Sequence, residues 1–103
     1  MSVIMQFSMF PTDKGASASA WVSRIIAMVS ASGHPYQLTS MATLVETDSL
    51  EEALQLLQKA YALLEPDCDR VYSTVTFDIR KNTSGRMHGK VQSIIEKIGP
   101  VNL

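Results

Sequence analysis

Two segments of the chain, residues 3–10 and residues 70–80, alternate between apolar and more polar side chains. Side chains of a β-strand point alternately to its two faces, so each segment predicts a strand. The first strand is partly apolar on both faces, whereas the second is apolar on one face only. Residues 36–39 and 41–46 are rich in aromatic, hydroxyl and β-branched side chains. These residue types favour strands, so the two segments predict a pair of shorter strands that separate at Ser40.

Three further segments carry apolar residues at helical spacing, about residues 17–32, 49–65 and 86–98. The first helix can be capped by Ser17 or Ser19, because a serine hydroxyl accepts from the free amides of a helix start. On the second helix we expect one buried stripe, which consists of Leu50, Ala53, Leu54, Leu57, Tyr61 and Leu64.

The predicted order is strand, helix, strand, strand, helix, strand, followed by one more helix. This order is the βαββαβ plan of a ferredoxin-like sandwich, an α+β fold, with an extra C-terminal helix, and we expect residues 1–103 to form one such domain. Both crossover helices then pack on the same face of the sheet and leave the other face open. The open face should carry Ile4, Gln6, Ser8 and Phe10 from the first strand and Tyr72, Thr74, Thr76 and Asp78 from the last. Such a mixture suits a subunit interface, a ligand floor, or both.

The composition limits the binding partners and the cellular compartment that we expect for this protein. The 103 residues are 46% hydrophobic with a net charge of −1, which gives no positive field to attract nucleic acid or anionic lipid. The single cysteine, Cys68, cannot form an intramolecular disulfide, and with two histidines it cannot build a multi-cysteine metal site. The N-terminus lacks the pattern of a secretory signal, and no apolar run reaches the ~20 residues that cross a bilayer. We therefore expect a cytoplasmic protein without nucleic-acid or membrane partners.

The segment Tyr-Gln-Leu-Thr-Ser-Met-Ala-Thr-Leu-Val-Glu at residues 36–46 resembles a motif of the YkoF-like thiamine-binding proteins. That motif runs tyrosine-x-leucine-threonine-proline-methionine-glycine-threonine-x-x-glutamate. Segments at both ends of the chain extend the resemblance over nearly its whole length. It implies a ferredoxin-like fold, assembly into dimers or tetramers through the sheets, and binding of thiamine or its hydroxymethylpyrimidine half without catalysis. The chain departs from the motif at Ser40 and at Ala42, where the added side chain can narrow a pocket.

Thiamine joins an aminopyrimidine, which needs paired donors and acceptors, to a cationic thiazolium, which favours carboxylates and aromatic faces. The side chains that we expect to bind it are Ser8, Tyr36, Thr39, Thr43, Glu46, Asp78 and Arg80. Phe10 and Trp21 are further candidates for stacking. Each has a structural alternative: Trp21 as core, the threonines as strand formers, Glu46 as an exposed strand end, and Asp78 with Arg80 as a surface ion pair. We favour the core position for Trp21.

Basic residues gather at the predicted start of the third helix, where free amides also favour anions. They are Arg80, Lys81, Arg86, His88 and Lys90. They form either a solvated basic turn or a site for a phosphorylated ligand such as thiamine phosphate. We expect Cys68 to be inert because negative neighbours disfavour its thiolate. No residue is predicted to be catalytic or to bind a metal. The alternative functions are a module that only assembles and, less favoured, a small enzyme that uses Glu46 or Asp78.

Overall fold

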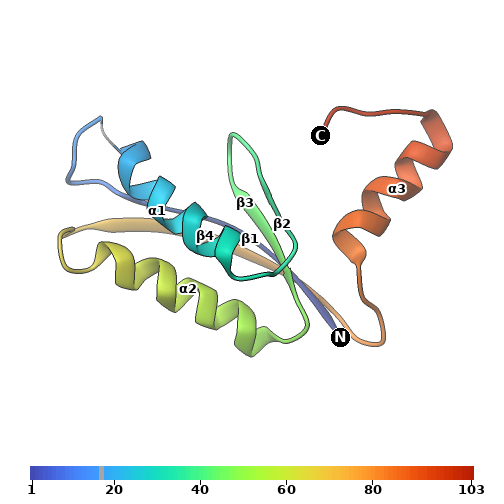
Figure 1. Ribbon diagram of the computed structural model, residues 1–103, viewed down its shortest axis with the longest axis horizontal. Coiled ribbons are helices and arrows are strands. Elements are labelled where there is room, and N and C mark those ends of the chain that lie inside the picture. The colour runs from blue at the N-terminus through green and yellow to red at the C-terminus, as the bar shows by residue number, and fades with distance from the viewer. Residues whose placement is uncertain (17) are drawn as a thin grey trace.

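The computed structural model describes residues 1–16 and 18–103, so the predicted cap Ser17 lies outside the described residues. Its elements follow the predicted order and are labelled in Figure 1. They are β1 (Ser2–Pro11), α1 (Ala18–Ala31), β2 (Tyr36–Leu38), β3 (Thr43–Thr47), α2 (Leu50–Leu64), β4 (Val71–Arg80) and α3 (Arg86–Ile98). The predicted one-residue break at Ser40 is wrong, because a turn over residues 39–42 separates β2 from β3.

The four strands form one antiparallel sheet in the order β2-β3-β1-β4. This order, with two crossover helices and α3 added at the end, confirms the ferredoxin-like fold. The central strand β1 is paired with β4 along its full length, from Ser2 opposite Arg80 to Pro11 opposite Val71. Its pairing with β3 is shorter and stops where Phe7 lies opposite Thr43.

The core lies between the sheet and the layer formed by α1 and α2. The odd positions of β1 are buried as the alternation predicts, and Ile25 and Val29 of α1 pack against them. On α2 the predicted stripe is partly wrong, because Leu50, Leu54 and Tyr61 are exposed. The buried residues are spaced three or four apart, so the helix turns a neighbouring stripe toward the core. The residues of α2 that are buried are Ala53, Leu56, Ala60 and Leu64.

The opposite face of the sheet is left open, as predicted. The even positions of β1 lie beside those of β4, and Gln6, Thr74 and Thr76 are exposed there. The extra helix α3 covers only one end of this face, where its first residue Arg86 contacts Ser2 and Asp78. The rest of α3 lies near the start of β1 and apart from α1 and α2 (Figure 1). Its Ile94 and Ile98 are 47% and 73% exposed. None of the helices in residues 1–16 and 18–103 is long and apolar enough to cross a membrane.

Candidate functional site

A cavity of about 370 Å³ lies between β1, α1 and the turn that joins β2 to β3. We call it the turn cavity. Its volume falls in the range of ~300–1,000 Å³ that is usual for small-molecule sites. Three residues predicted to bind ligand, Ser8, Thr39 and Thr43, line it together. Most of the remaining wall is apolar and comes from Phe7, Met9, Val22, Ile25, Ile26 and Leu38.

The hydroxyl of Thr39 holds the turn that forms one wall of this cavity. It donates to the carbonyl of Ala42 at 2.8 Å and accepts from the amides of Met41 at 3.3 Å and Ala42 at 3.1 Å. The amide of Thr39 also donates to the Ala42 carbonyl at 2.9 Å. Because these bonds use the hydroxyl as donor and as acceptor, its role here is to shape the wall. Ala42 itself lines the cavity, so its methyl group takes part of the space that a glycine would leave.

Thr43 is the polar residue best placed to meet a ligand. It lies opposite Phe7 on the helix-facing side of the sheet and is only 4% exposed. No other described residue hydrogen-bonds its hydroxyl, whereas every fully enclosed polar side-chain atom in the described part of the chain has a partner. The Thr43 hydroxyl is therefore not fully enclosed, and Thr43 is one of the residues that line the turn cavity.

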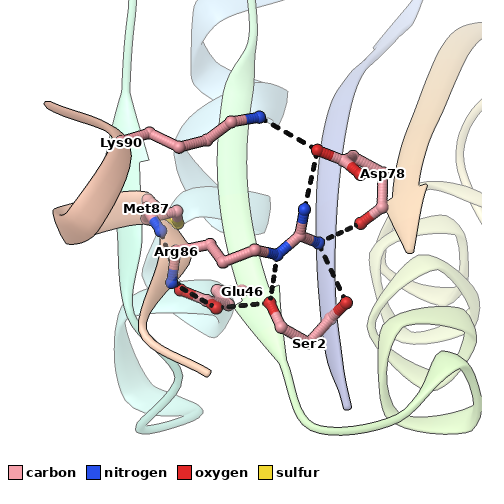
Figure 2. Close-up of polar contacts among 6 residues, drawn as sticks. All are labelled: Ser2, Glu46, Asp78, Arg86, Met87 and Lys90. Atoms are coloured by element: carbon pink, nitrogen blue, oxygen red, sulfur yellow. Dashed lines mark hydrogen bonds and ion pairs between the residues drawn. The ribbon is translucent and has the colours of Figure 1, made fainter. Parts of the chain in front are cut away.

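Glu46, also predicted to bind ligand, lies in a different place, beneath the start of α3 (Figure 2). It is 7% exposed, so the alternative of a solvent-exposed strand end is wrong. Its carboxylate accepts from Ser2 Oγ at 2.5 Å and from the amides of Arg86 at 2.9 Å and Met87 at 3.0 Å. Burial raises the pKa of Glu46, but these three hydrogen bonds and the Arg86 charge outweigh it, and the net pKa is lowered. Glu46 is thus an ionised cap for α3.

The side chain of Arg86 completes this arrangement. Its Nε donates to Ser2 Oγ at 3.0 Å, and Nη2 donates to the carbonyls of Ser2 at 2.9 Å and Asp78 at 2.6 Å. Its Nη1 lies 2.8 Å from the Asp78 carboxylate, which Lys90 also reaches at 2.9 Å (Figure 2). Hydrogen bonds from Arg86 and Lys90 lower the pKa of Asp78. The predicted pairing of Asp78 with Arg80 is therefore wrong. We call Ser2, Glu46, Asp78 and Arg86 the anchor network.

The anchor network also argues against one of the two alternatives for the start of α3, a site for a phosphorylated ligand. That alternative required free amides, but the first two amides of the helix, those of Arg86 and Met87, donate to Glu46. The guanidinium of Arg86 is buried and bonded within the protein. An internal carboxylate thus occupies the place that an external anion would take.

The other candidates lie outside the turn cavity, with one exception. Tyr36 borders a separate hollow with Met87, and Arg80 borders another with Lys90. Trp21 packs against the core, which confirms its structural reading, and the guanidinium of Arg24 lies 4.5 Å from its ring centre. The exception is Phe10, which lines the turn cavity.

Cys68 lies in the segment between α2 and β4 and is buried. Burial raises the pKa of its thiol, and the nearby Asp13 and Asp67 carboxylates raise it further. The thiol form is therefore favoured, as the sequence predicted from its acidic neighbours.

Comparison with known proteins places the chain in a family. Residues 5–95 match the family described as thiamine-binding protein. The chain belongs to this family. Its resemblance to YkoF-like thiamine-binding proteins is thereby confirmed. It is 31% identical over 83 residues to a UPF0045 protein of Methanothermobacter thermautotrophicus, a match that covers 80% of this chain and 84% of the relative.

Two solved structures show the same fold. The crystal structure of protein MJ1052 from Methanocaldococcus jannaschii superposes with a TM-score of 0.81 at 30% identity, covering 92% of this chain and 97% of that one. A Thermotoga maritima protein whose proposed role is thiamine biosynthesis or salvage superposes with a TM-score of 0.79, covering 91% and 99% of the two chains. At 19% identity the second likeness supports the fold alone.

Proposed function

We propose that this protein binds thiamine, or its hydroxymethylpyrimidine half, in the turn cavity. The observation that carries the proposal is that Thr43, whose hydroxyl has no hydrogen-bond partner among the described residues, lines a largely apolar cavity. A flat aromatic ring gains free energy by leaving water for apolar walls, and one well-placed hydroxyl then fixes its orientation. Membership of the thiamine-binding protein family supports this choice of ligand.

The cationic thiazolium half of the ligand has a partner in the same cavity. Phe10 lines it, and an aromatic face attracts a cation with ~0.5–2 kcal/mol, depending on how far both are removed from water. The ring of Phe10 is held in place by Tyr72, with ring centres 5.8 Å apart. We therefore assign the pyrimidine to the part beside Thr43 and the thiazolium to the part beside Phe10.

The chemistry of the cavity favours binding over turnover. Its lining, taken over the described residues, contains no carboxylate, imidazole, thiol, amine or guanidinium. General acid–base catalysis needs such a group within hydrogen-bond reach of the reacting atom. We therefore expect thiamine incubated with the protein to be recovered with its mass unchanged. A new product that forms only with the intact protein would show that the protein is an enzyme.

We propose further that two or four copies assemble through the open face of the sheet. Tyr72 on that face is 54% exposed, and apolar surface of this kind is stabilised when a second chain covers it. We place the protein in the cytoplasm, where the free thiol of Cys68 stays reduced.

Native mass spectrometry of protein purified from its own cells tests ligand and assembly together. The expected spectrum shows dimers or tetramers that retain thiamine or its pyrimidine half. Oligomers that never bind thiamine, even when it is added, would favour the alternative of a module that only assembles. Single chains at micromolar concentration would contradict the proposed assembly.

A further inference from the structure

The strand β1 lacks a partner on one side beyond Phe7. On the other side it pairs with β4 through Pro11, but β3 begins only at Thr43, opposite Phe7. The position that would lie opposite Met9 is Met41, which is at the tip of the turn and 86% exposed. The chain therefore joins the sheet too late to pair with Met9.

The direction of the backbone groups of β1 follows from two hydrogen bonds. The amide of Thr12 donates to the carbonyl of Arg70 at 2.9 Å. By the alternation along the strand, the backbone N–H and C=O groups of the even-numbered residues of β1 therefore point toward β4. The amide of Glu46 donates to the carbonyl of Pro35 at 3.0 Å. The backbone groups of the even-numbered residues of β3 thus point toward β2, and those of the odd-numbered residues point toward β1. Since a residue in an antiparallel strand directs its N–H and C=O to the same side, the N–H and C=O of Met9 face the gap that β3 leaves.

The sequence agrees with this assignment. Pro11 is also an odd position of β1, so its nitrogen, which carries no hydrogen, faces the same unpaired side. Proline is tolerated in strands where no ladder hydrogen bond is required.

Met9 borders the turn cavity and is only 8% exposed. Backbone N–H and C=O groups that no protein group pairs favour any ligand that supplies both hydrogen bonds. Within residues 1–16 and 18–103, no backbone group of the turn makes a hydrogen bond to Met9 across the gap. The cavity thus presents one donor and one acceptor side by side on a flat strand edge.

Building on the proposed function, we propose that the backbone of Met9 recognises the aminopyrimidine of the ligand. The exocyclic amine donates to the Met9 carbonyl, and the adjacent ring nitrogen accepts from the Met9 N–H. The ligand then takes the place opposite Met9 that β3 would fill if it began two residues earlier, in the way that a peptide adds to a free strand edge. Thr43, the first residue of β3, lies beside this edge, where its hydroxyl can meet the same ring.

The test uses unmodified protein and two ligands. Oxythiamine carries an oxygen in place of the exocyclic amine and a hydrogen on the adjacent nitrogen, so it reverses the donor and acceptor that Met9 requires. We expect thiamine to bind at least about tenfold more tightly than oxythiamine, because two mismatched hydrogen bonds cost well over the ~1.4 kcal/mol of a tenfold change. In amide-resolved NMR, thiamine should shift the Met9 amide and slow its hydrogen exchange. The amide of Met5, which is paired with β3, serves as the internal control.

Two results overturn the inference while leaving the proposed function intact. One is equal affinity for thiamine and oxythiamine. The other is saturable thiamine binding that leaves the Met9 amide unmoved. If thiamine shifts no amide around the turn cavity and gives no saturable binding, the proposed function fails, and the inference fails with it.

Discussion

The backbone amide of Arg86, the first residue of α3, donates to Oε2 of Glu46 on β3 at 2.9 Å. The two residues are 40 positions apart in sequence, so a strand near the middle of the chain caps a helix near its end. Most of α3 lies away from the rest of the domain, as Figure 1 shows. The attachment of the helix therefore depends on its first turn and on the anchor network around it.

Replacement of Glu46 by glutamine should destabilise the protein by about 1–3 kcal/mol at neutral pH. The amide nitrogen of glutamine cannot accept a hydrogen bond, so one of the amides of Arg86 and Met87 loses its partner. Urea unfolding at pH 7 measures this loss. Glu96→Gln, an exposed change on the same helix, is the matched control and should have little effect.

The same variant should change the response to acid. The pKa of Glu46 is lowered in the folded protein, so its stabilisation is complete above the unfolded pKa of about 4.3 and is lost as the pH falls toward the folded pKa. The free-energy difference between wild type and Glu46→Gln should therefore be constant from pH 7 to about 5 and shrink below about 4.3. A difference that stays constant down to pH 3 would show that the charge of Glu46 has no such role.

Arg86 and Lys90 both contact the carboxylate of Asp78, but they should contribute differently to the stability of the protein. Arg86→Ala removes a buried side chain that bonds Ser2 as well as Asp78, so we expect a loss of about 2–4 kcal/mol and faster proteolysis within α3. Lys90→Ala removes only an exposed partner and should change little. Thermal unfolding and limited proteolysis of the two variants check this order. Equal effects would mean that Arg86 acts only as a surface charge.

If copies assemble through the open face of the sheet, a charge introduced on that face should disrupt assembly, whereas a charge on the helical face should not. Tyr72→Lys places a charge on the open face and should shift the protein to single chains in light scattering. Leu54→Lys is the matched control, because Leu54 is 46% exposed on α2 and lies on the covered side of the sheet. If both variants keep the wild-type mass, the open face is not the interface.

Much of the fold follows from local pattern, because alternation and helical spacing each reflect contact with a single core. The anchor network could not be predicted in this way, since Ser2, Glu46, Asp78 and Arg86 come from four separate segments. Thr39 and Thr43 show the same limit on a smaller scale. Both were expected to offer hydroxyls, but the turn geometry, which the sequence does not reveal, commits Thr39 to its own backbone and leaves Thr43 facing the cavity.

Calorimetric titration with thiamine of wild type, Thr43→Val and Thr76→Val tests the assignment of the turn cavity most directly. Valine keeps the shape of threonine and removes only the hydroxyl, and Thr76 lies on the open face outside the cavity. We expect saturable binding to wild type, about five- to tenfold weaker binding to Thr43→Val, and unchanged binding to Thr76→Val. Equal affinity of all three proteins, or no binding by wild type, would contradict the account.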